Sequence, residues 1–182
     1  MSEQNWYDTI SAIAIEQKKT KPKIEDVIPY YLDGNMKKTA LDFVSYLHEN
    51  KMKPVWASAN AWKVSYKSKG VCYVRLHRGE IEKNNWNSKS WVIEPRIFNY
   101  DEYEEQIVNE KLQDIIWKNL YYCKFCHPAP CKIRNTKLLG KEVKGICGGR
   151  PPAWFWDPGE AEINCVKRLL EFEKNFIEKN KK

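Results

Sequence analysis

Four cysteines lie close together in the second half of the chain: Cys123, Cys126, Cys131 and Cys147. A C-x2-C turn points two thiolates at one ion, and a tetrahedral zinc site then takes two more ligands from a returning segment. The pattern therefore predicts a structural zinc held by the four thiolates, with His127 as a substitute for any one of them. Free thiols in a loop-rich segment, a disulfide, and an iron–sulfur cluster or redox thiol are the alternatives.

The segment around this cluster needs a source of order. Residues 123–150 are poor in large apolar side chains, yet helical patterns flank them. Metal ligation supplies free energy where a core is missing. The other two cysteines, Cys72 and Cys165, fall within a predicted strand and a predicted helix, so we expect both to be core residues.

Aromatic residues form a second group. Eight Trp, ten Tyr and six Phe provide more ring surface than a disordered chain carries, which predicts either a core of large side chains or an aromatic-lined pocket. In an extended segment Trp154 and Trp156 face the same side, and the alternative for them is a plug that docks the last helix. The candidate pocket residues are Trp56, Trp62, Tyr66, Tyr73, His77, Trp154 and Trp156.

Positive charge is concentrated in two blocks. The net charge is +7, and residues 51–97 carry ten basic and three acidic side chains, while residues 123–156 carry seven and one. Together the blocks favour an anionic partner, and solvated surface lysines are the alternative. Candidate phosphate contacts for nucleic acid are Lys63, Lys67, Lys69, Arg75, Arg78, Lys124, Lys132, Arg134 and Lys137.

Motifs of known enzyme classes are absent from the sequence. It contains no G-x-S-x-G, no P-loop, no G-x-G-x-x-G and no H-E-x-x-H, and it has only three histidines. The sequence thus favours a non-enzymatic protein. For an enzyme of unrecognised type, His77 or a carboxylate such as Glu94 pointing into a cleft is the expected sign.

The sequence predicts four helices, recognised by apolar spacing and capping residues. Apolar spacing predicts helices over residues 5–17 and 36–50, with the basic run 18–23 as a linker and 29–34 as a turn. A capping box at Asp101 opens a third helix, which continues to residue 116. Asp157, as the cap before Pro158, opens the last helix.

Strand patterns follow the second helix. Alternation over residues 53–58, 62–67 and 71–76 predicts an antiparallel meander, with 67–70 as its hairpin loop. Residues 91–94 before a proline add a fourth strand, and the polar stretch 78–87 is a predicted loop. The predicted class is α+β, an antiparallel sheet of three to four strands with helices packed on it and a cysteine-rich loop insertion.

Length fits a single domain over residues 1–182. Its predicted parts are an N-terminal helix and linker (1–23), a helix–sheet–helix core (24–122), the cysteine-rich insertion (123–156) and a C-terminal helix (157–182). The first residues lack a basic region followed by an apolar run, and no stretch reaches the ~20 apolar residues of a membrane span. We therefore expect a cytoplasmic protein without membrane partners.

The stretch Trp62–Leu76, preceded by the helix at 36–50, resembles the strand meander of small uncharacterised bacterial α+β domains of the YjbR-like type. This resemblance covers about a third of the chain. It implies the fold and a cytoplasmic setting, and it transfers no catalytic residue.

Taken together, these features favour a protein that binds a small aromatic or anionic ligand in an aromatic pocket braced by a zinc knuckle. Nucleic-acid binding through the basic and aromatic surface is the first alternative, and an unrecognised enzyme is the second.

Overall fold

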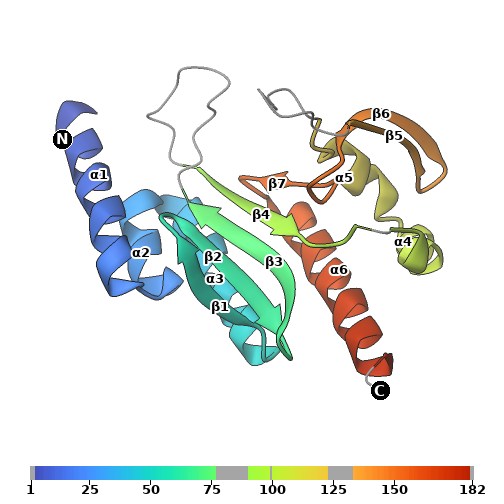
Figure 1. Cartoon of the computed structure of the whole chain (residues 1–182), viewed down its shortest axis with the longest axis horizontal. Coiled ribbons are helices and arrows are strands. Elements are labelled where there is room, and N and C mark those ends of the chain that lie inside the picture. Colours follow the sequence, from blue (N-terminus) through green and yellow to red (C-terminus); the bar gives the residue numbers. More distant parts are fainter. Residues whose placement is uncertain (1–2, 77–89, 99, 123–132, 181–182) are drawn as a thin grey trace. The chain divides into compact units, whose positions relative to one another are not determined.

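The chain folds into helices and antiparallel strands (Figure 1). The computed structural model describes residues 3–76, 90–98, 100–122 and 133–180, with side chains from residue 12 onward. One sheet has the strand order β1-β2-β3-β4-β7, and a second sheet pairs β5 with β6. The α+β prediction is confirmed, with five strands in the larger sheet instead of three or four. By its internal contacts the chain divides into two compact units, Met1–Ile93 and Glu94–Lys182.

Three helices open the first unit: α1 (Glu3–Thr20), α2 (Ile24–Tyr31) and α3 (Gly34–Glu49). The first runs through Lys18 and Lys19, beyond its predicted end. The second replaces the turn expected near Pro29, because its apolar residues recur at helical spacing and are buried along one side, namely Ile24, Val27, Ile28 and Tyr31. Pro29 inside α2 removes one backbone hydrogen bond, and burial of the apolar side of the helix offsets that loss.

Four strands follow in the first part of the sheet: β1 (Lys53–Ser58), β2 (Ala61–Tyr66), β3 (Lys69–Leu76) and β4 (Trp91–Pro95). Their positions match the predicted meander. On β2 the side chains of Trp62, Val64 and Tyr66 are buried while Lys63 is exposed, as the alternation predicted. The apolar stripe of α3 packs on the sheet, and Phe43 meets Trp91 with ring centroids 6.2 Å apart.

The β2–β3 hairpin turns within the predicted loop 67–70, but its turn is only two residues long. Lys67 and Ser68 both have positive φ (45° and 70°), which is the geometry of a two-residue turn that matches strand twist. Gly70, expected within the loop, belongs to β3, and the pairing register shifts between Val64 and Ser65.

Polar contacts bind the end of α1 to the β1–β2 turn. Gln17, only 2 % exposed, donates from Nε2 to Asn60 Oδ1 (2.7 Å) and accepts at Oε1 from the Asn60 backbone N–H (2.8 Å). Close by, Trp62 Nε1 donates to the carbonyl of Pro22 (2.9 Å). Gln17 therefore fixes Asn60 in the turn, and the bond from Trp62 to Pro22 holds the predicted linker against the sheet.

The second unit begins with short helices: η1 (Tyr100–Tyr103), α4 (Glu104–Asn109) and α5 (Gln113–Lys118). The sequence predicted one helix through this region. It is interrupted at Lys111, whose φ of 56° lies in the left-handed region and cannot continue a helix.

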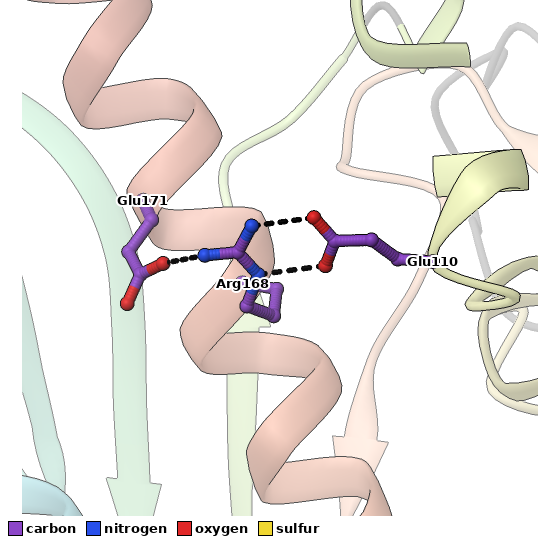
Figure 2. A network of polar contacts seen from close by, with 3 residues as sticks. All are labelled: Glu110, Arg168 and Glu171. Atoms are coloured by element: carbon purple, nitrogen blue, oxygen red, sulfur yellow. Dashed lines mark hydrogen bonds and ion pairs between the residues drawn. The ribbon is translucent and has the colours of Figure 1, made fainter. Parts of the chain in front are cut away.

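The last helix, α6 (Glu160–Lys179), begins later than predicted. Asp157 has a φ of 40°, so it does not cap the helix, and Gly159 takes the cap position. Arg168 of α6 grips the carboxylate of Glu110 with two guanidinium nitrogens and also contacts Glu171 (Figure 2). Glu110 directly follows α4, so its ion pair with Arg168 connects the turn between α4 and α5 to α6.

A hairpin occupies part of the predicted cysteine-rich loop. Its strands are β5 (Ile133–Leu138) and β6 (Lys141–Cys147), joined through Leu139 and Gly140, which both have positive φ. Trp117 of α5 donates from Nε1 to the Leu138 carbonyl (3.1 Å), which holds the hairpin on that helix. The short strand β7 (Phe155–Trp156) follows. Residues 133–147 therefore have order from pairing and packing, without reference to a metal.

Candidate functional site

Of the four predicted zinc ligands, the structure describes one. Cys147 ends β6 and is 4 % exposed. Cys123, Cys126 and Cys131, with His127, lie outside the described residues, so the zinc prediction stays a prediction. Within the ranges described, no group of three or more Cys, His, Asp and Glu side chains is placed to hold a metal ion.

The described residues on either side of 123–132 both lie beside the end of β6. Tyr122 forms an isolated antiparallel bridge with Ile146, and Ile133 pairs with Cys147 in the β5–β6 register. In sequence, Cys123 directly follows Tyr122, and Cys131 precedes Ile133 by two positions. The chain therefore leaves and re-enters the described structure next to Cys147.

The predicted pocket residues are spread over both units. In the first unit Trp62 (0 % exposed) and Tyr66 (3 %) are core residues, and Trp56 and Tyr73 are partly exposed. In the second unit Trp154 is buried (2 %) and Trp156 is exposed (37 %). His77 lies outside the described residues. The pocket as a set of seven stays a prediction.

Trp154 is held by neighbours of its own unit. Its ring stacks on Tyr121 with centroids 3.9 Å apart and planes inclined by 9°, and the Arg150 guanidinium lies 5.3 Å from its centroid. Nε1 donates to the carbonyl of Pro151 (3.2 Å), and the backbone N–H bonds to the carbonyl of Asn119 (2.8 Å). This indole is an anchor for the segment that leads into α6.

A different surface carries charge in the first unit. Residues 51–76 contain six basic side chains and no acidic one: Lys51, Lys53, Lys63, Lys67, Lys69 and Arg75. The core face of β1–β3 is covered by the helices of the unit, with α2 and α3 both packing near β1. The opposite face of these three strands, which we call the open face, displays Lys63 with exposed Val55 and partly exposed Tyr73.

Strand register places these side chains in one row. Val55 of β1 pairs with Lys63 of β2, and Lys63 pairs with Tyr73 of β3. Because directly opposed residues in a sheet project to the same face, the row crosses all three strands on the open face. It presents an apolar side chain, a cation and an aromatic ring in that order.

Next to this row lies Arg75, two positions along β3 from Tyr73 and on the same face. Its guanidinium is 4.8 Å from the Tyr73 ring centroid, close enough for cation–π attraction, which holds both groups in place. The sequence identified Lys63, Lys67, Lys69 and Arg75. It missed Val55 and Lys53, although their alternate positions in the predicted first strand, level with Lys63 and Ser65, are a usable signal.

Buried thiols occupy the positions expected of core residues. Cys72 and Cys165 are both 0 % exposed, which confirms that prediction. Burial, reinforced by the charge of Glu162, raises the pKa of the Cys165 thiol to about 12. Such a thiol stays protonated near neutral pH and is a poor nucleophile. Glu94, the carboxylate considered for an enzyme, is 2 % exposed.

Comparisons with protein-family models, with curated proteins and with solved structures found no match. The YjbR-like resemblance accordingly stays a prediction. None of the helices in the described ranges combines the length and the apolar character needed to cross a membrane.

Proposed function

We propose that this protein binds nucleic acid through the open face of β1–β3. The observation that carries the proposal is that strand register places Lys53, Lys63 and Arg75 on this face, within a segment (residues 51–76) that has six basic and no acidic side chains. Lysines near a phosphate chain release its counterions, which is the main source of sequence-independent affinity for nucleic acid. The predicted cytoplasmic setting contains such ligands.

Two further facts favour this function over the small-ligand pocket. Trp62, Tyr66 and Trp154, three of the seven predicted pocket residues, are core side chains, and the first of them is bonded through its indole nitrogen. The open face instead offers its cations and Tyr73 on regular strands, where side chains are held at fixed spacing. Binding of a small anionic ligand in a pocket is the alternative.

The test is binding of a fluorescein-labelled 20-nucleotide DNA, followed by anisotropy between 50 and 200 mM salt. Reversing one charge in the centre of the row, Lys63→Glu, is expected to lower affinity about tenfold at 50 mM salt and to flatten its salt dependence. The matched control is Lys18→Glu, the same charge change on exposed α1. Equal affinity of both variants, or binding that does not weaken with salt, overturns the proposal.

We propose as well that Cys147 joins Cys123, Cys126 and Cys131 around a structural zinc ion. The support is the position of the chain: Tyr122 and Ile133, which flank residues 123–132, are both paired beside Cys147. Thiolate is a preferred zinc ligand, and a buried thiol at a strand end followed by glycines suits a closed structural site.

Elemental analysis of protein purified without added metal tests the zinc proposal. About one zinc per chain is expected, lost in Cys147→Ser and kept in Cys165→Ser, because Cys165 is buried within α6. A metal-free protein in which all cysteines titrate as thiols and chelator leaves stability unchanged would be the opposite result.

A further inference from the structure

We infer that the nucleic acid bound by the open face is single-stranded and that a base stacks on the platform formed by Tyr73 and Arg75. The inference rests on the proposed function and specifies its ligand. It comes from the short turns that join β1 to β3 and from the position of Tyr73 in the row, neither of which the charge argument uses.

Residues 53–76 carry no projecting element of the kind that enters a duplex groove. Strands β1 to β3 are joined by two-residue turns at 59–60 and 67–68, so no helix or long loop stands out from residues 53–76. The major groove, about 12 Å wide, admits an α-helix or a two-stranded ribbon. A three-stranded surface is one strand wider than the ribbon that this groove accommodates.

Tyr73 supplies an aromatic ring on which an unpaired base can stack. Unpaired bases expose their flat faces, and stacking on aromatic rings or guanidinium planes is the usual way a protein holds them without reading sequence. Tyr73 is partly exposed, and the Arg75 guanidinium lies over its ring, 4.8 Å from the centroid, so the pair offers a guanidinium plane backed by a ring on which a base can stack. In a duplex both faces of each base are already stacked.

The order of side chains in the row fits one nucleotide and its neighbour. With a base on Tyr73, the adjacent Lys63 lies on the next strand within reach of the phosphate. Val55, 60 % exposed beyond Lys63, offers an apolar contact to a second base or sugar. Apolar, cationic and aromatic groups thus follow one another at strand spacing along a line that an extended strand can take.

The experiment compares a labelled 12-nucleotide oligo-dT with a 12-base-pair duplex at 100 mM salt. The wild-type protein is expected to bind the single strand at least tenfold more tightly. Tyr73→Ala is expected to weaken single-strand binding at least fivefold with an unchanged salt dependence, since stacking of a base involves no counterion release. Tyr73→Phe, which keeps the ring, should restore affinity, and Arg75→Lys should lose part of it.

Each outcome separates the inference from the proposed function. If Lys63→Glu weakens binding but Tyr73→Ala and Arg75→Lys do not, or if the duplex binds as tightly as oligo-dT, the stacking platform is wrong and the basic face stands. If neither nucleic acid binds to the wild-type protein, the proposed function itself fails. Far-ultraviolet circular dichroism of each variant, and the Phe variant above all, distinguishes a lost contact from a lost fold.

Discussion

The two units place the same residue types on different kinds of structural element. In the second unit, cations contact side chains of their own unit: Arg168 binds Glu110 and Glu171 (Figure 2). Arg150 lies over the Trp154 ring and Lys141 over the Trp117 ring. In the first unit Lys67 lies over the Tyr66 ring and Arg75 over the Tyr73 ring, and strand register places Lys53, Lys63 and Arg75 on one face of β1–β3. A content of lysine, arginine and aromatics therefore does not identify a binding surface until the packing of each side chain is known.

The difference has a physical origin. The second unit combines the long helix α6 with short helices, a hairpin and isolated bridges, and contacts such as the Arg168 pair and the Tyr121–Trp154 stack connect these elements. The first unit has a sheet on a helical layer and a continuous core.

The largest expected effect separates core rings from surface rings. Trp62→Ala, at a fully buried position with a bonded indole nitrogen, is expected to lower the free energy of unfolding by about 3–5 kcal/mol. Trp156→Ala in the second unit, at a ring that is 37 % exposed, should cost less than about 1 kcal/mol. Urea unfolding followed by circular dichroism measures both. Similar losses for the two variants would mean that Trp62 is not a core residue.

Alkaline pH is expected to destabilise the two units from different starting points. Burial raises the pKa of Cys165 from 9.0 to about 12 and that of Tyr31 from 10.0 to about 12. In both cases the unfolded chain releases the proton first, so stability is complete below the unfolded pKa and falls as pH rises toward the folded one. At pH 10.5 ionisation of Cys165 in the unfolded chain is expected to lower the free energy of unfolding by on the order of 2 kcal/mol.

Urea unfolding between pH 8 and pH 11 tests these contributions. Wild-type stability should begin to fall above pH 9, and Cys165→Ala should move that onset to about pH 10, where Tyr31, Tyr100 and Tyr103, whose pKa values are also raised, begin to contribute. Tyr31→Phe should leave the onset at pH 9 and weaken the later fall. An unchanged onset in Cys165→Ala would show that the thiol is not kept neutral by burial.

The two hairpin turns provide the smallest contrast. Ser68 in the first unit has a φ of 70° without being glycine, whereas Gly140 in the second has a φ of 80°. Ser68→Gly is expected to stabilise the protein by up to about 1 kcal/mol, and Gly140→Ala to destabilise it by about 1 kcal/mol. A Cβ at Gly140 would meet no atom within 4 Å, so any loss there comes from the backbone alone. Thermal unfolding detects both, and changes of the same sign would contradict the assigned turn geometry.

Elements with strong periodicity could be predicted from the sequence. The helix α3 and the strands β1 to β4 follow the apolar patterns of residues 36–50, 53–76 and 91–94, because one face of each element is buried. The helix α2 was missed because Pro29 was taken as turn chemistry, although the spacing of its buried residues is helical.

The rest depends on contacts between distant residues. The break at Lys111 and the late start of α6 after Asp157 come from positive φ at residues that are not glycine, which sequence pattern does not indicate. The β5–β6 hairpin is held by a hydrogen bond from Trp117. Its strands carry polar residues on both faces, so the sequence lacks the apolar–polar alternation that indicates a strand. For the candidate site, the sequence predicted the cations and Tyr73 as separate candidates. Their alignment in one row across β1–β3 could be recognised only from the strand register.

The most direct test of nucleic-acid binding by the open face is a nuclear magnetic resonance titration of ¹⁵N-labelled protein with the 12-nucleotide oligo-dT. Amide shifts are expected to change most at Val55, Lys63 and Tyr73 and their neighbours in β1–β3, while the amides of β5 and β6 keep their positions. Shifts confined to the β5–β6 hairpin, with β1–β3 unaffected, would place binding in the wrong unit and contradict this account.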